Sequence, residues 1–113
     1  MEIEPAIDKF MELCQELIDE HHEKNYPSIG VPKLSRAGGR KFLRIGMRVG
    51  SFGSSVYCFI ALADGKNKNL GSFKQGDIFK AASWKAPAKH ARGNVFDESN
   101  GVGRMSSYGA AYL

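Results

Sequence analysis

The sequence predicts an α+β protein, in which one N-terminal amphipathic helix packs on an antiparallel sheet of three to five strands. Three observations support this fold class. Apolar residues recur at spacings of three and four over residues 3–24, as on one face of a helix. They alternate with other residues over 40–49 and again over 55–62, as in half-buried strands. With 113 residues, 42% of them hydrophobic and 25% charged, the chain has the composition of a single globular domain.

Charge is divided unequally along the chain. Residues 1–24 contain eight acids and two lysines, a balance of −6, whereas residues 25–113 contain 14 lysines and arginines and four acids, a balance of +10. We therefore divide the domain into an acidic helix (3–24), a connection (25–39) and a basic β-rich body (40–113). A basic body favours a polyanionic partner such as nucleic acid. The alternative is a solvated basic surface that the chain's own acidic helix balances.

The helix is expected to start at Glu4 or Pro5, because proline is tolerated only in the first turn. Its apolar face contains Ile7, Phe10 and Cys14, and its acids fill the opposite face. The connection that follows contains two prolines and three glycines, which argue against regular structure over most of 25–39.

The first two strands of the body are expected at 40–49 and 55–62. In 40–49 and 55–62 the residues predicted to face the helix are Leu43, Ile45, Met47, Val49, Val56, Cys58, Ile60 and Leu62. The residues predicted on the other face are Arg40, Phe42, Arg44, Arg48, Ser55, Tyr57, Phe59 and Ala61. Gly46 interrupts this second row and leaves room for a bulge or for a close approach of another segment. Arginines beside aromatic rings on an open face would form a platform on which nucleic-acid bases stack. The alternative is a second apolar layer, in which residues 83–113 cover the rings and leave the arginines at its rim.

The remaining segments are a polar hairpin tip at 63–76, a third strand at 77–84 and a basic loop. The loop carries the single tryptophan of the chain, Trp84, with Lys85, Lys89, His90 and Arg92. Pro87 is expected to end ladder pairing, and residues 88–92 are expected to form one helical turn. Residues 97–104 are expected to be a loop, and residues 105–113 a short strand or helix that docks on the body.

No catalytic set is expected, because the sequence contains no GxSxG, HExxH, CxxC or phosphate-loop motif. Cys14 and Cys58 are expected to be buried, reduced thiols, and neither a metal nor a cofactor is predicted. No apolar run approaches the roughly 20 residues that span a bilayer, and the N-terminus does not resemble a signal peptide. We expect a cytoplasmic location with no membrane partner.

Three stretches of the C-terminal half carry a resemblance to a known group. They are VYCF at 56–59, GDIFKAASWKAPAKHARGNVFD at 76–97 and SYGAAYL at 107–113. They resemble a group of small, mostly uncharacterised bacteriophage proteins. The resemblance implies a phage gene product that acts in the cytoplasm of an infected bacterium. It assigns no functional residue.

The leading hypothesis is a protein that binds single-stranded nucleic acid, or nucleic acid without sequence preference. Its expected contact residues are Arg40, Arg44, Arg48, Tyr57, Trp84, Lys85, Lys89, His90 and Arg92. One alternative is a phage inhibitor that binds a host transcription or defence enzyme through its acidic helix. Another is a sponge for a nucleotide signal, with an anion pocket formed by residues 84–94.

Overall fold

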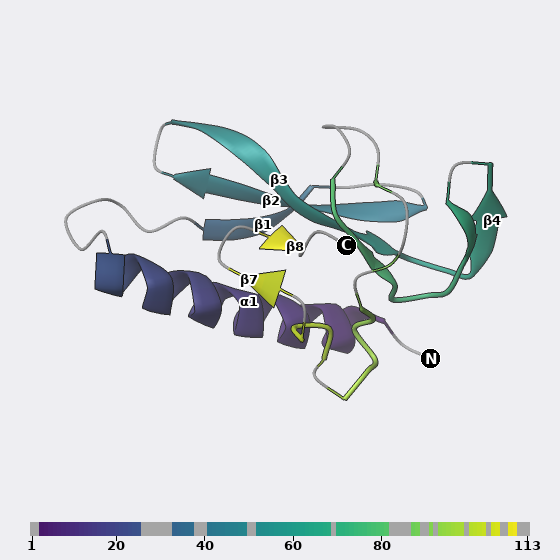
Figure 1. Ribbon diagram of the computed structural model, residues 1–113, viewed down its shortest axis with the longest axis horizontal. Coiled ribbons are helices and arrows are strands. Elements are labelled where there is room, and N and C mark those ends of the chain that lie inside the picture. The colour runs from purple at the N-terminus through teal and green to yellow at the C-terminus, as the bar shows by residue number, and fades with distance from the viewer. Residues whose placement is uncertain are drawn as a thin grey trace.

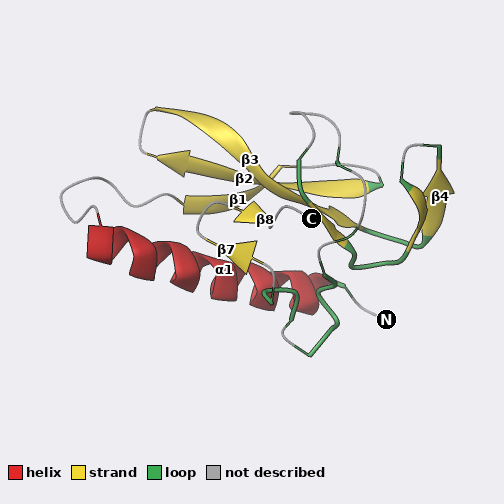
Figure 2. Cartoon of the chain, in the orientation of Figure 1, coloured by secondary structure: helices red, strands yellow, loops and turns green. Residues whose placement is uncertain are grey.

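One α-helix covers one face of a four-stranded antiparallel sheet (Figures 1 and 2). The computed structural model describes residues 3–25, 33–37, 41–49, 52–68, 70–81, 87–88, 91, 93–98, 100–103, 105–106 and 109–110. The strand order in the sheet is β1-β2-β3-β6, and β4-β5 and β7-β8 form separate two-stranded sheets. The predicted α+β class, a helix packed on an antiparallel sheet, is therefore confirmed. Within the described residues no helix is long and apolar enough to cross a membrane.

The helix α1 (Glu4–Asn25) supplies one side of the main core. Ile7, Phe10 and Cys14 are buried at successive turns, as the spacing predicted. Ile18 is buried on the next turn, where Leu17 was expected, and Leu17 is partly buried. Pro5 lies in the first turn, where its missing N–H leaves no intrahelical hydrogen bond unmade. The exposed acids lie away from this core, so α1 has an apolar inner face and an acidic outer face.

The strand β1 (Lys33–Ala37) was not predicted, because it lies inside the segment expected to be an irregular connection. It pairs antiparallel with β2 (Phe42–Val49) along its whole length. Leu34 packs against the main core, and its N–H donates a hydrogen bond of 2.9 Å to Oε1 of Gln15 on α1. A helix side chain therefore satisfies a backbone donor of this edge strand.

The pairing of β2 with β3 (Phe52–Ala61) contains a bulge at Tyr57. Ile45 is opposite Cys58, but the next residue, Gly46, is opposite Val56, so Tyr57 is the extra residue on β3. The bulge expected at Gly46 is thus present, although its extra residue belongs to the partner strand. Upstream of it the alternation is inverted, and Val56 packs on the face away from the helix.

A second, smaller core covers part of the outer sheet face. It consists of the buried residues Phe59, Ala61, Phe73 and Phe79, with Phe42, Val56, Leu70 and Ala81 packed against them. Phe73 comes from the hairpin of β4 (Gly65–Asn67) and β5 (Gly71–Phe73), which forms in the predicted polar tip. Phe79 comes from β6 (Ile78–Phe79), which covers two residues of the strand predicted over 77–84; residues 82–84 of that prediction lie outside the described residues.

The C-terminal segment forms a short hairpin of β7 (Met105–Ser106) and β8 (Gly109–Ala110). Met105 is buried in the main core, where β7 contacts α1 and β8 contacts β3 (Figure 1). Of the two forms predicted for this end, a docked strand or a docked helix, the described residues adopt the strand. Turns occupy much of the described part of 97–104, as expected.

Candidate nucleic-acid interface

The outer face of the sheet places two exposed cations side by side. Lys33 on β1 is directly opposite Arg48 on β2, and both side chains are exposed. Their strand neighbours Leu34 and Met47 pack toward the helix, so Lys33 and Arg48 project from the opposite face. Like charges directly opposite each other in a sheet are destabilising, and a bound anion relieves that repulsion.

Arg44 lies further along the same face, beside the second core. It is half-buried and opposite Phe59, which belongs to that core. The predicted outward positions of Arg44, Arg48, Phe42 and Phe59 are thus confirmed. The basic residues of this face are therefore exposed at Lys33 and Arg48 and partly covered at Arg44.

The aromatic rings described on this face pack on one another and do not form an open platform. Phe59 and Phe79 are 3% and 2% exposed, and the ring of Phe42 lies 5.0 Å from that of Phe73 and 5.8 Å from that of Phe79. These tilted and edge-on contacts are the geometry in which aromatic rings attract one another. The alternative of a second apolar layer, rather than an open stacking platform, therefore holds for these rings. Among the described residues the cover comes from 70–81, and not from 83–113 as that alternative expected.

Tyr57 was predicted on the outer face and lies instead in the main core, where it is 2% exposed. The bulge turns its side chain toward α1, and its hydroxyl donates a hydrogen bond to the Cys14 sulfur. Burial raises the pKa of Tyr57, and burial raises the pKa of Cys14 from 9.0 to about 12. Burial likewise raises the pKa of Cys58 well above its usual value. The prediction that Tyr57 stacks on a ligand is wrong, whereas that of two buried, free thiols is confirmed.

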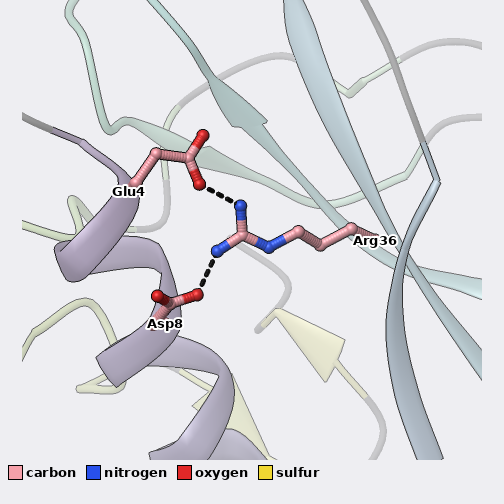
Figure 3. Close-up of polar contacts among 3 residues, drawn as sticks. All are labelled: Glu4, Asp8 and Arg36. Carbon is pink, nitrogen blue, oxygen red and sulfur yellow. Dashed lines mark hydrogen bonds and ion pairs between the residues drawn. The ribbon is translucent and has the colours of Figure 1, made fainter.

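One further arginine, Arg36, forms ion pairs within the protein. Arg36 on β1 forms ion pairs with Glu4 and Asp8 on the first turns of α1 (Figure 3). Its hydrogen bond to Glu4, with the charges of both carboxylates, raises the pKa of Arg36. Arg36 thereby holds the acidic helix against the edge of the sheet and neutralises part of its charge.

The two sides of the basic loop are paired where the loop leaves the sheet. Isolated bridges join Asp77 to Asn94 and Ala81 to Pro87. Pairing therefore reaches Pro87, contrary to the prediction, because the neighbouring N–H of Ala88 donates to the carbonyl of Lys80 at 2.6 Å. The side chain of Asn94 reinforces this pairing by donating to Asp77 Oδ1 and accepting from the N–H of Phe96.

A model of a family of unknown function (DUF7717) matches residues 2–111. The chain belongs to this family. No curated protein and no solved structure shows a significant match to it.

In this DUF7717 chain the predicted contact residues separate into three groups. Arg44 and Arg48 share the outer face of the sheet, and Tyr57 lies in the core. The other six lie outside the described residues: Arg40, Trp84, Lys85, Lys89, His90 and Arg92. The helical turn expected at 88–92 also falls largely on residues that are not described.

Sequence reasoning missed Lys33, whose position opposite Arg48 depends on the unpredicted strand β1. The alternation of Lys33, Leu34 and Ser35 was the available signal. Among the described residues no group of three or more His, Cys, Asp or Glu side chains could hold a metal ion.

Proposed function

We propose that this protein binds nucleic acid, single-stranded or without sequence preference, through the outer face of its sheet. The observation that carries the proposal is the cross-strand pair of exposed cations, Lys33 and Arg48. Two like charges held this close raise the free energy of the unbound protein, and a phosphate row offsets that repulsion. Arg44 lies on the same face and extends the basic surface.

The separation of charge between the two layers supports the same proposal. The exposed acids of α1 lie on the helix side, away from the face that carries Lys33 and Arg48. A polyanion is thus attracted to one side of the molecule and repelled by the other, which orients its approach. The resemblance of residues 76–97 to phage proteins further supports a phage product that acts in the host cytoplasm.

The test compares two double charge reversals. Lys33→Glu/Arg48→Glu changes the proposed surface, and Lys9→Glu/Lys24→Glu makes the same charge change on exposed positions of α1. Fluorescence anisotropy with a labelled single-stranded oligonucleotide measures affinity across a salt series. The first variant should flatten the plot of log K against log salt by about 1.4, since each lost phosphate contact removes about 0.7. The second variant should keep the wild-type slope.

Circular dichroism and urea unfolding show whether both variants remain folded. Equal slopes for the two variants, or a wild-type affinity that does not change with salt, would remove the proposal. A duplex of the same sequence, measured beside the single strand, shows which form is preferred.

The alternative function is an inhibitor that binds a host protein through the acidic helix. It is supported by five exposed acids of α1 outside the contacts of Arg36: Glu12, Glu16, Asp19, Glu20 and Glu23. Deleting the helix cannot test it, because α1 supplies Ile7, Phe10, Cys14 and Ile18 to the main core. Replacing Glu12, Glu16 and Glu20 with Gln keeps that core intact. Loss of co-purification with a host protein, with oligonucleotide binding retained, would favour the inhibitor over the nucleic-acid binder.

A further inference from the structure

A pocket of about 310 Å³ lies between the residue that precedes β2 and the β4–β5 hairpin. This volume is at the lower end of the range for ligand-binding pockets, about 300–1,000 Å³. The hairpin is at the opposite end of the molecule from the C-terminal end of β2 (Figure 1). Arg48, in the cationic pair, is seven positions after Lys41, at the pocket. Along an extended strand this is a separation of about 23 Å.

The inner wall of the pocket is preformed. Phe73 lines it, is 7% exposed and is fixed by its ring contact with Phe42. Gly65 also lines it, and a Cβ at that position would lie 2.6 Å from the Phe73 ring. The hairpin can therefore close over the ring only with glycine there. The pocket gains an apolar wall that does not depend on a ligand for its shape.

The rim of the pocket is charged and has an excess of cations. Lys41 and Lys66 line it from segments 25 positions apart, and both are exposed. Neither ammonium group forms an ion pair with a described residue. Asp64 is the one carboxylate among the described lining residues, and its Oδ1 accepts a hydrogen bond of 2.8 Å from the N–H of Gln75.

We propose that this pocket binds a phosphorylated ligand of about one nucleotide. The phosphate lies between Lys41 and Lys66, because lysine binds phosphate as a point charge. A hydroxyl or amino group donates a hydrogen bond to Asp64, and the ring of the ligand contacts Phe73. The ligand is either a free nucleotide or the phosphorylated end of a nucleic-acid strand, which present the same chemistry. The sequence had suggested a nucleotide pocket at residues 84–94, whereas this one lies at the hairpin.

The experiment is a calorimetric titration of the full chain with AMP, adenosine and inorganic phosphate. AMP should bind more tightly than either fragment, because it alone combines the phosphate with the ring. Lys41→Gln and Lys66→Gln should each weaken AMP binding at least about tenfold. Lys68→Gln removes the same charge from an exposed residue near β4 that does not line the pocket, and should leave the affinity unchanged. Absence of AMP binding, or equal losses in all three variants, would overturn the proposal.

Two oligonucleotides of one sequence, with and without a 5′-phosphate, distinguish the sources of the ligand. A preference for the phosphorylated strand that is lost in Lys41→Gln identifies a strand end. AMP binding without such a preference identifies a free nucleotide. The sheet-face variant Lys33→Glu/Arg48→Glu should retain AMP binding, so failure of this site and failure of the proposed strand binding give different results.

Discussion

The sharpest structural prediction concerns Gly101, where the helix and the sheet meet the C-terminal segment. Gly101 is buried with a φ of +87°, and an added Cβ would lie 2.5 Å from Ile78 Cδ1 and 3.0 Å from Phe10 Cδ1. Both neighbours are fully buried and cannot withdraw into solvent. Gly101→Ala therefore combines two costs: about 1–2 kcal/mol for a left-handed backbone and about 1–3 kcal/mol for overpacking.

The expected loss is roughly 2–5 kcal/mol of a total stability that for such domains is about 5–15 kcal/mol. Gly71→Ala is the matched control, because Gly71 has a φ of +74° but no atom within 4 Å of an added Cβ. It should cost only the backbone term, about 1–2 kcal/mol. The lowered entropy of the unfolded chain is common to both variants and cancels in the comparison.

Urea unfolding followed by circular dichroism measures both variants, and the midpoint concentrations give the difference in the free energy of unfolding. The difference between the variants isolates the packing at the junction of Phe10, Ile78 and Val95. If Gly101→Ala costs no more than Gly71→Ala, the close approach of these elements is wrong. The reasoning that places the C-terminal segment against α1 would then fail with it.

Three further predictions concern the helix and its contacts. Because burial raises the pKa of Cys14 from 9.0 to about 12, the unfolded chain loses this thiol proton first. The free energy of unfolding should then fall above about pH 9, by up to about 1.4 kcal/mol per pH unit, and Cys14→Ala should flatten that part of a urea-unfolding pH profile. Tyr57→Phe removes the hydrogen bond to Cys14 and should lower the free energy of unfolding by about 0.5–1.5 kcal/mol in the same assay. It should leave oligonucleotide affinity unchanged, and reduced affinity at unchanged stability would mean that Tyr57 contacts the ligand. Arg36→Gln should cost at most about 1 kcal/mol and less in 1 M salt, because its partners Glu4 and Asp8 are 68% and 72% exposed; a larger, salt-independent loss would contradict this.

The helix and the central strands could be predicted because their signals are local. The spacing of Ile7, Phe10 and Cys14 defines a helix face without reference to any other segment. The strand β1 could not be predicted in this way. Its stability depends on contacts with α1, through Leu34 with Gln15 and Arg36 with Glu4 and Asp8, which are far away in sequence.

The site was less predictable than the fold because one bulge alters which side chains share a face. The alternation over 55–62 is unbroken in the sequence, so it predicted Val56 inside and Tyr57 outside. The extra residue in β3 exchanges the two. Tyrosine tolerates either side, since its ring is apolar and its hydroxyl finds a hydrogen-bond partner, here the Cys14 sulfur.

This exchange has a consequence for how a nucleic acid would be recognised. With Tyr57 in the core and the phenylalanines packed on one another, the described part of the outer face offers cations but no open ring for a base. Binding there would follow the phosphate backbone, and it should therefore depend steeply on salt and little on sequence. In the proposed hairpin pocket, by contrast, the ring of the ligand contacts the aromatic side chain of Phe73. A preference for one base over another, if measured, should accordingly respond to replacement of Asp64 or Phe73 rather than of Lys33 or Arg48.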